Sequence, residues 1–512
     1  MLHLTLPKRE RATFNALTHT ATLQQMREKG DEDYSRAHPL KHSPARLDTD
    51  ALEVRRQTAH ASFFDPLFSD ARSSLIMQPA RVKFSAELGP VGGRCANHKK
   101  QTNLHSTKVV NPVEAFSQKT FIETAVAEMK RSIGNEKTLV AVSGGVDSTT
   151  CAVLTRRAIG ENLVCVILDD AFMRQGEPEH VVETLSKSPF DLPVKIVNVS
   201  DRFTQAIKGL GDAEEKRKMF RETFYQVLSE TAKNEGCKIL VQGTIRADVI
   251  ETVGGVKTQH NVLEQMGINP IQKFGFKVVE PLVQLSKEQV RTVARHLGLP
   301  TELSERQPFP GPGLSVRVIG EIRPEKLEIL KTATTIVEHE LAVHKPGQYF
   351  AVIVDNEEAP QTSKALHIQE TVAHLLNVPS RNVHVKVFAD KATGVEGGKR
   401  RYGEIVGIKV QTMDGKLHQT SILNLVSVQA RIVTENPPVA RVLYAVKDSA
   451  QKKPYVIGIR SVQTRDFLTA EVSEIPWTTL DKIGEEVVEQ CSDVSTVYYD
   501  VTPKPPATIE ME

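Results

Sequence analysis

The chain has 512 residues, of which 40% are hydrophobic and 25% are charged, and its formal net charge is +2. Its length exceeds the usual size of a single domain, so two or three compact domains are expected. The composition is typical of globular proteins and excludes a fibrous or wholly disordered chain. No run of about 18 apolar residues occurs, and charged residues and Pro stand where a signal peptide needs an apolar stretch. We therefore expect a cytoplasmic protein that is neither secreted nor embedded in a membrane.

The cysteines favour the same compartment. Their number is odd and they are widely spaced, with no Cys-x-x-Cys pair to indicate zinc, an iron–sulfur cluster or a redox dithiol. They are Cys95, Cys151, Cys165, Cys237 and Cys491. We expect free thiols in a reducing cytoplasm.

Residues 1–110 are predicted to be a low-order, mostly disordered N-terminal extension. They hold 17 Lys and Arg against 11 Asp and Glu, include turn-prone pieces, and show no sustained period of 2 or 3.6. Such a segment could be dispensable, serve in targeting, or form an arm for nucleic acid or another partner. Because the rest of the chain has a net negative charge, we expect no basic face there and no nucleic-acid partner.

Strand and helix patterns alternate over residues 111–322. The expected elements are a helix at 116–134, strands at 138–143 and 162–169, a helix at 177–187, a strand at 194–200, a long helix at 214–236 and a strand at 238–244. This rhythm predicts an α/β domain with a parallel sheet and helices on both faces. Ligands bind such sheets beyond the carboxyl ends of the strands.

Longer strands characterise residues 323–512, which we expect to be an α+β domain. The expected elements are strands at 346–355, 382–390, 401–415 and 440–447 and a helix at 422–434. A weak internal repeat relates Gly407–Thr412 (GIKVQT) to Gly458–Thr464 (GIRSVQT), and each copy leads through a helix to a second strand. Duplicated β-α-β pieces of this kind suggest a sheet that could serve as a dimer interface.

The strongest local motif is S-G-G-V-D-S-T, which stands where a strand ends and a helix begins. It consists of Ser143, Gly144, Gly145, Val146, Asp147, Ser148 and Thr149. Glycines allow close backbone approach, and N–H groups at a helix N-terminus bind anions, so the turn suits phosphate. Asp147 would repel a bare phosphate, which indicates Mg²⁺ between its carboxylate and the phosphate oxygens. The Gly-Lys-Ser/Thr of a Walker A loop is missing.

This loop resembles the pyrophosphate loop of the N-type ATP pyrophosphatases, which transfer AMP to an oxygen and release pyrophosphate. Further segments resemble motifs of GMP synthetase in the family's order over roughly residues 110–512. They are 214–218, 242–251, 256–261, 306–314 and 504–512. The resemblance implies an adenine nucleotide alpha-hydrolase-like domain at 111–322 and a dimerisation and xanthylate-binding domain at 323–512.

The resemblance also implies roles for individual residues. Residues Ser143–Thr149 would bind ATP, and Asp147 would be catalytic through Mg²⁺. Lys257, in a loop beside Gly254-Gly255, would be a second catalytic residue that a mobile lid brings to the phosphates. The residues implied for the xanthylate nucleotide are Arg202, Gln348, Lys504, Ile509 and Glu510. Three positions depart from the family pattern, namely Ala171, where glycine is usual, Gln259, where histidine is usual, and Gly398, where an acidic residue is usual.

The implied reaction is ATP-dependent conversion of xanthosine 5′-monophosphate to GMP through an adenylated intermediate, with ATP and Mg²⁺ as cofactors. Complete GMP synthetases carry a class I glutaminase domain, whereas Gly93–Asn97 only imitates its nucleophile motif and lacks the second glycine. The chain thus resembles the archaeal-style synthetase, which works with a separate glutamine amidotransferase subunit and is expected to form a homodimer.

Two alternatives remain open from the sequence. One is another ATP pyrophosphatase, such as a tRNA thiolase or an NAD synthetase, although the thiolase's paired cysteines are absent and neither enzyme explains the segment Lys504–Glu510. The other is a catalytically idle nucleotide-binding or RNA-binding protein that uses residues 1–110.

Overall fold

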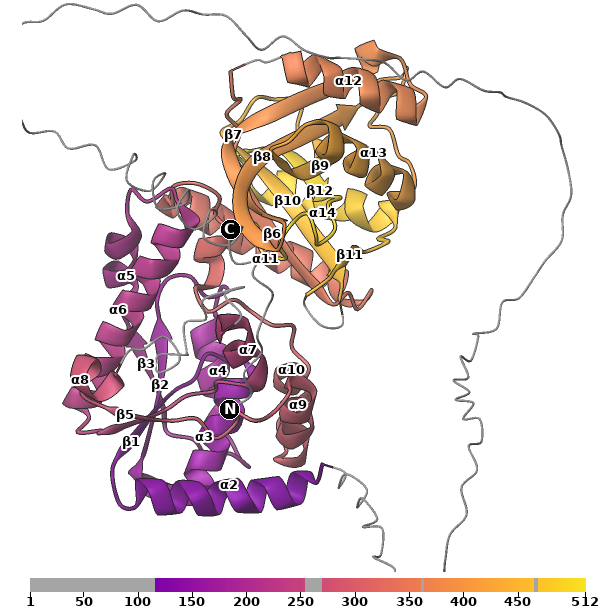
Figure 1. The fold of residues 1–512 in the computed structure, drawn as a ribbon. Helices are drawn as coiled ribbons and strands as arrows, with labels where there is room; N and C mark the ends of the chain where they lie inside the picture. Colours follow the sequence, from indigo (N-terminus) through magenta and orange to yellow (C-terminus); the bar gives the residue numbers. More distant parts are fainter. Residues whose placement is uncertain (1–115, 254–268, 361–362, 465–467) are drawn as a thin grey trace, which may run out of the picture. The chain divides into compact units, whose positions relative to one another are not determined.

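A computed structural model describes residues 116–253, 269–360, 363–464 and 468–512 (Figure 1). All of them belong to one compact unit, Ser106–Glu512. The helices are α2 Gln118–Ile133, α3 Val146–Ile159, α4 Glu177–Leu185, α5 Ser200–Ile207, α6 Ala213–Asn234, α7 Arg246–Val253, α8 Pro270–Phe274, α9 Lys287–His296, α10 Thr301–Ser304, α11 Pro324–Ala342, α12 Ser363–Leu376, α13 Ile422–Glu435 and α14 Trp477–Gln490, with short 3-10 turns η1 Gly160–Asn162, η3 Gly313–Val316 and η4 Ser380–Asn382. The strands are β1 Thr138–Ala141, β2 Leu163–Asp169, β3 Val194–Asn198, β4 Ile239–Val241, β5 Lys277–Val279, β6 Gln348–Asp355, β7 Val383–Glu396, β8 Lys399–Val410, β9 Val439–Asp448, β10 Tyr455–Gln463, β11 Glu471–Val472 and β12 Val494–Asp500. The predicted extension 1–110 and Lys257 lie outside the described residues.

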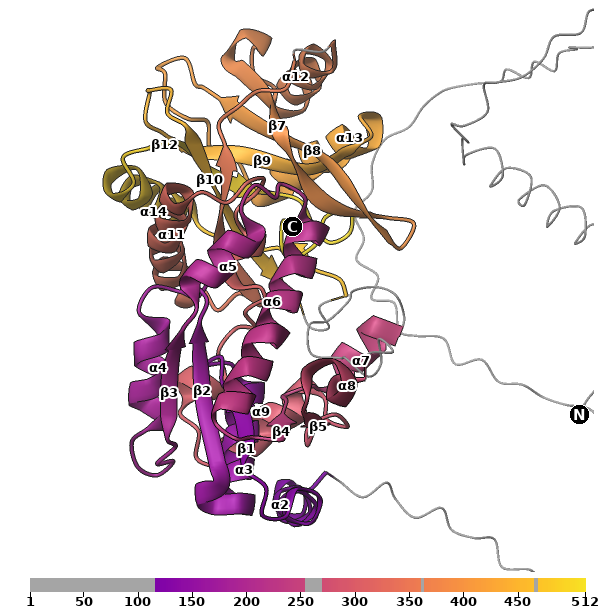
Figure 2. The same cartoon turned by 90° about the vertical axis from the view of Figure 1, so that its left-hand side faces the viewer.

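The first sheet confirms the predicted parallel α/β fold. Its strand order is β3-β2-β1-β4-β5, and every neighbouring pair is parallel (Figure 2). Thr138 of β1 pairs with Leu163 on one side and Ile239 on the other, so β1 is central. The chain winds outward in opposite directions from β1, and in sheets of this kind the ligand-binding crevice lies at such a switch point, here at the carboxyl ends of β1 and β4.

Helices cover both faces of this sheet because successive strand residues point to opposite sides. Val140 belongs to a core cluster with residues of α2, α3, α4 and α9. Its neighbour Leu139 belongs to a different cluster, which includes residues of α5 and α6. Figure 1 shows α5, α6 and α8 on one side of the sheet and α3, α4 and α9 on the other.

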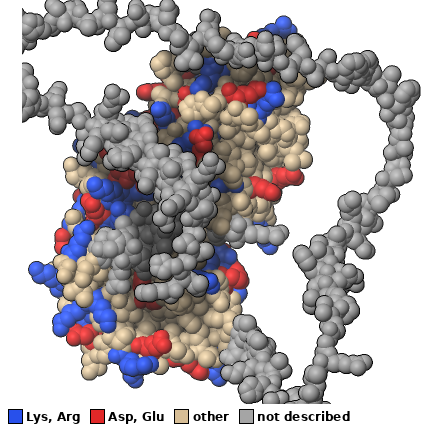
Figure 3. Space-filling model, in the orientation of Figure 1, with Lys and Arg blue, Asp and Glu red and all other residues tan. Residues whose placement is uncertain are grey.

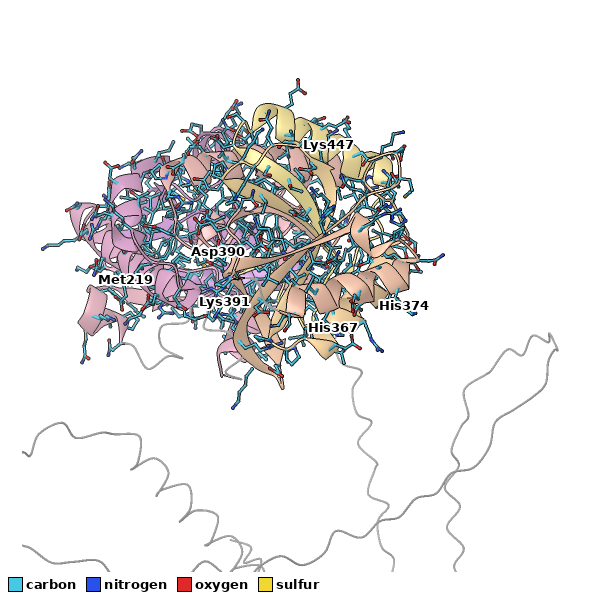
Figure 4. The ribbon with its side chains drawn as sticks, turned by 90° about the horizontal axis from the view of Figure 1, so that it is seen from above. Met219, His367, His374, Asp390, Lys391 and Lys447 are labelled. Carbon is cyan, nitrogen blue, oxygen red and sulfur yellow. The ribbon has the colours of Figure 1, made fainter. Side chains whose placement is uncertain are left out.

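The second sheet has the order β11-β10-β12-β9-β8-β7, with β6 antiparallel to β10. The two segments of related sequence each form a strand, a helix and a parallel strand, namely β8-α13-β9 and β10-α14-β12. Antiparallel pairing of β9 with β12 joins the two units. In Figure 4, His367 and His374 mark α12, and Lys447 marks the part of β9 on which Gly484 of α14 packs.

Four cysteines lie in the described ranges, and Cys151, Cys165, Cys237 and Cys491 are all buried and free. Free thiols were expected at these four positions, and Cys95 lies outside the description. Among the described helices, none combines the length and apolar composition that crossing a bilayer requires. Basic and acidic side chains of the described residues are interspersed on the face shown in Figure 3.

Candidate active site

The pyrophosphate loop, residues 143–149, follows β1 and leads into α3 at the crevice of the parallel sheet. Gly144 has a φ of 72°, and a Cβ atom there would lie 2.7 Å from Cγ2 of Val181. Gly145 stands at the helix N-cap in extended conformation and supplies no side-chain cap. Within the described residues the N-terminus of α3 is therefore capped by no side chain, which leaves its N–H groups available for an anion such as phosphate.

Two serines fix the shape of the loop. The Ser143 N–H donates to Ser148 Oγ at 3.1 Å, and Ser148 Oγ donates to the carbonyl of Gly145 at 3.2 Å. The two hydroxyl oxygens are 3.1 Å apart. Val146 and Thr149, by contrast, are buried within the domain, so they hold the loop in place.

Asp147 lies in the first turn of α3 with one oxygen paired and one not. Its Oδ2 accepts a hydrogen bond from Lys287 Nζ at 2.6 Å. Its Oδ1 is buried and meets no hydrogen-bond donor in the described parts of the chain. Burial raises the pKa of this carboxyl group, while the charge of Lys287 acts to lower it.

The unpartnered oxygen of Asp147 fits the proposed Mg²⁺ site. Within the described ranges, no three His, Cys, Asp or Glu side chains are grouped to hold a metal ion. Mg²⁺ at nucleotide sites is commonly bound by one or two carboxylates together with phosphate oxygens and water. A single carboxylate with a free buried oxygen beside an anion-binding loop meets that requirement.

The end of β4 lies directly against this loop. A Cβ atom at Gly243 would be 2.9 Å from both the Asp147 carbonyl carbon and the Ser148 nitrogen. The motif that begins Gln242-Gly243 thus contributes close packing at the crevice. Lys287, which the sequence did not single out, stands at the first position of α9, soon after β5. Its place after a neighbouring parallel strand is the signal that could have indicated it.

The C-terminal segment 501–512 is positioned by buried arginines. Arg441 and Arg460 are fully buried, and both form ion pairs with Asp500, at 3.0 and 3.2 Å. Arg441 also donates to Thr508 Oγ1 at 2.8 Å and to the carbonyl of Glu510 at 2.6 Å. Burial lowers the pKa of Arg441 to about 10, although Asp500 opposes this shift.

Four of the residues implied for the purine nucleotide lie within residues 323–512, and the fifth lies on α5. Glu510 is held by Arg317 through hydrogen bonds of 3.0 and 3.1 Å, and Ile509 packs on the core beside it. Gln348 donates to the carbonyl of Pro308 at 3.1 Å, and the Lys504 backbone pairs with Ala470. Arg202 lies elsewhere, on α5, where it forms an exposed pair with Glu230.

The segment 214–218 at the start of α6 reaches the chain's last residues. Lys216 is fully buried and forms an ion pair with Glu512, while its Nζ also donates to the carbonyls of Val318 and Gly320 at 2.8 and 2.9 Å. Arg217 donates to the backbone oxygen of Glu512. Burial raises the pKa of Glu512 to about 6, against the opposing effect of Lys216.

Comparison with known proteins bears on the interpretations left open above. The PP-loop domain family matches residues 118–301, and the GMP synthase C terminal domain family matches residues 445–511. One subunit of the glutamine-hydrolyzing GMP synthase of Sulfurisphaera tokodaii is 41% identical over 398 residues, which cover 78% of this chain and 100% of that protein. The corresponding subunits from Saccharolobus solfataricus and Methanopyrus kandleri are 40% and 39% identical, with the same coverage. The chain belongs to this family of GMP synthase subunits.

Two of the three departures from the family pattern can be located in the described part of the chain. Ala171 has a φ of 74°, a left-handed conformation that favours the glycine usual in GMP synthases. Gly397 and Gly398 form the turn between β7 and β8 with φ values of 56° and 77°. Positive φ at both central residues suits a tight hairpin, so Gly398 is compatible with the turn. Gln259 lies outside the described residues.

Proposed function

We propose that the chain catalyses the ATP-dependent amination of xanthosine 5′-monophosphate (xanthylate) to GMP, releasing AMP and pyrophosphate. It would be a cytoplasmic ligase of purine nucleotide biosynthesis. The observation that carries this proposal is the pyrophosphate loop, in which, among the described residues, a helix N-terminus without a side-chain cap stands beside Asp147 Oδ1 without a hydrogen-bond partner. Membership of the GMP synthase family supports the same reaction.

The loop supplies the chemistry of adenylation. The oxygen at purine C2 attacks the α-phosphate of ATP, and pyrophosphate leaves. Ser143, Ser148 and the N–H groups of α3 would stabilise the charge that develops on pyrophosphate. Asp147 would hold Mg²⁺, which supplies further stabilisation of the phosphoryl charge. Lys257 is proposed to bring the positive charge of its own side chain to the same phosphates. Ammonia then displaces AMP from C2.

The purine nucleotide would bind at residues 323–512, which we also propose as the dimerisation domain of a homodimer. Glu510, to which Arg317 donates two hydrogen bonds, would accept hydrogen bonds from the base. Gln348, Ile509 and Lys504 would complete the site. To bind the nucleotide phosphate, Arg202 would have to give up its ion pair with Glu230. Residues 111–322 are proposed as the ATP pyrophosphatase domain, and 1–110 as an extension outside both.

We propose that ammonia comes from a separate glutamine amidotransferase subunit. Amide hydrolysis by a cysteine needs an accessible thiolate of low pKa. Burial instead raises the pKa of Cys165 to about 12 and that of both Cys237 and Cys491 to about 11. Burial also raises the pKa of Cys151 well above its ordinary value. These four thiols are therefore poor nucleophiles for glutamine.

The test is GMP formation by the purified chain from xanthylate, ATP and Mg²⁺ with either ammonium or glutamine. We expect GMP with ammonium, at a rate that rises with pH as free NH₃ increases, and almost none with glutamine. Adding a matching amidotransferase subunit should restore the use of glutamine. Efficient glutamine use by the chain alone would contradict the two-subunit proposal, and inactivity with ammonium would favour the idle-protein alternative.

A further inference from the structure

A row of six charged side chains of alternating sign runs from the pyrophosphate loop to Glu510. In order they are Arg306, Glu177, Arg174, Glu338, Arg317 and Glu510. Their exposed fractions range from 0% to 24%, so water screens their interactions only weakly. Because three cations alternate with three anions, each inner member shares its charge between two partners.

At its Arg306 end, this row of charged side chains lies against the backbone of the pyrophosphate loop. A Cβ atom at Gly144 would be 3.3 Å from both the Arg306 guanidinium and a Glu177 carboxylate oxygen. Arg306 and Glu177 are themselves paired at 2.7 Å. Phosphate oxygens bound at this loop would therefore compete with Glu177 for Arg306, since arginine binds phosphate and carboxylate in the same bidentate manner.

In the middle, Glu338 of α11 is shared by two arginines. Arg174 donates to its two oxygens at 2.6 and 2.9 Å, and Arg317 lies 3.8 Å away. Both guanidinium groups lie over the ring of Phe309, at 4.1 and 4.9 Å from its centroid. Glu338 also accepts a hydrogen bond from Gln307 Nε2 at 3.2 Å, but that amide carries no charge. Any loosening of the Arg174 contact would thus let Glu338 attract Arg317 more strongly.

At the other end, Arg317 divides its charge between Glu338 and Glu510. It is fully buried, lies over the Phe350 ring at 4.0 Å, and forms two hydrogen bonds with the Glu510 carboxylate. A stronger attraction between Glu338 and Arg317 would weaken the hydrogen bonds between Arg317 and Glu510. The Glu510 carboxylate would then be more available to a purine base.

We propose that Glu338 is a positioning residue that couples the pyrophosphate loop to Glu510, so that ATP and xanthylate strengthen each other's binding. The inference rests on the proposed function, because it places ATP at the loop and xanthylate at Glu510. When ATP phosphates bind Arg306, its ion pair with Glu177 weakens. Glu177 then attracts Arg174 more strongly, so Arg174 moves away from Glu338. Glu338 in turn attracts Arg317 and weakens its hydrogen bonds with Glu510. Linkage requires xanthylate to strengthen ATP binding by the same factor.

The test is the affinity for xanthylate with and without a saturating non-hydrolysable ATP analogue and Mg²⁺, measured by calorimetry. In the unaltered chain, we expect the analogue to tighten xanthylate binding by about fivefold or more, the lower end of typical coupling. Glu338→Gln keeps the side chain's shape and removes its charge, so the factor should fall below about twofold. Each nucleotide alone should still bind this variant.

Glu328→Gln is the matched control, because Glu328 lies on the same helix but is 68% exposed and pairs only locally with Lys331. It should keep the coupling of the unaltered chain. If thermal unfolding shows that Glu338→Gln does not fold, Arg174→Lys replaces it, since lysine keeps the charge but cannot form the two-pronged pair.

Each outcome decides between the two proposals. An unaltered coupling factor in Glu338→Gln, or in Arg174→Lys, would overturn the inference and leave the proposed function standing. A factor near one in the unaltered chain would do the same. Failure of the unaltered chain to bind xanthylate under any condition would instead contradict the proposed function, and the inference with it.

Discussion

The pyrophosphate loop and the C-terminal segment 501–512, each of which we propose to bind a nucleotide, are built in opposite ways. The loop is formed by consecutive residues, and its anion-binding groups are backbone N–H groups at the start of α3. The C-terminal segment is held by buried side chains distant in sequence, such as Arg317 on Glu510 and Lys216 on Glu512. The first arrangement leaves charge-binding groups open, whereas in the second each charge already has a partner. A change in the loop should therefore affect the chemical step, and a change in the segment should affect binding and stability.

The largest effect is expected at the loop. Asp147→Asn should lower the rate of xanthylate-dependent pyrophosphate release by about 100-fold or more at saturating Mg²⁺, because charge stabilisation through a metal supplies several kcal/mol. Xanthylate affinity and thermal stability should change little. Asp414→Asn, at an exposed turn, is the control and should leave the rate unaltered. A loss of about tenfold or less would argue against the metal-binding role.

A change in the C-terminal segment should alter the KM for xanthylate more than it alters kcat. Glu510→Gln removes one charged partner of Arg317 and of the base, and hydrogen bonds to charged groups contribute about 1.5–3 kcal/mol. The KM for xanthylate should rise about tenfold or more, while kcat changes much less. Steady-state kinetics at saturating ATP checks this split. A fall in kcat with an unchanged KM would remove the contrast between the two regions.

The segment that follows β2 and leads to Arg174 should show its effect in the pH dependence of stability. Burial raises the pKa of Asp170 from 3.8 to about 7, opposed by its hydrogen bond from the Phe172 N–H. Between pH 3.8 and about 7, Asp170 holds a proton in the folded chain and has released it in the unfolded chain. The contribution of Asp170 to stability is thus fully present below the lower value and is lost, by up to about 1.4 kcal/mol per pH unit, as pH rises through the folded value near 7.

Asp170→Asn does not titrate and should lose less stability between pH 5 and pH 8. Unfolding by denaturant at both pH values measures the difference. Glu512, whose pKa burial raises to about 6, gives the variant a residual dependence of the same sign. An identical pH dependence in both proteins would show that Asp170 titrates near its ordinary value.

The smallest effect is expected outside both regions. Deleting residues 1–105 should leave xanthylate-dependent pyrophosphate release within about twofold, as for changes away from any functional contact. The deletion precedes every motif, and relatives that match over their full length cover 78% of this chain. A collapse in soluble yield or activity would indicate that the extension packs on the rest of the protein.

The contrast between the two regions also explains what sequence could and could not predict. The loop and the parallel strands depend on neighbouring residues, so local pattern was enough to predict them. Arg317 and Glu510 are separated by 193 positions, and Lys287 and Asp147 by 140. No periodicity links such partners, because only the tertiary fold brings them together. The motif 214–218 was recognised by resemblance, yet the burial of Lys216 against Glu512 became apparent only in the structure.

We propose that the loop and the C-terminal segment act on two nucleotides in one reaction. This proposal is tested by pyrophosphate release from the purified chain with ATP, Mg²⁺ and ammonium, measured with and without xanthylate. We predict release that depends on xanthylate and equals the GMP formed. Release at the same rate without xanthylate, or none in its presence, would contradict the account.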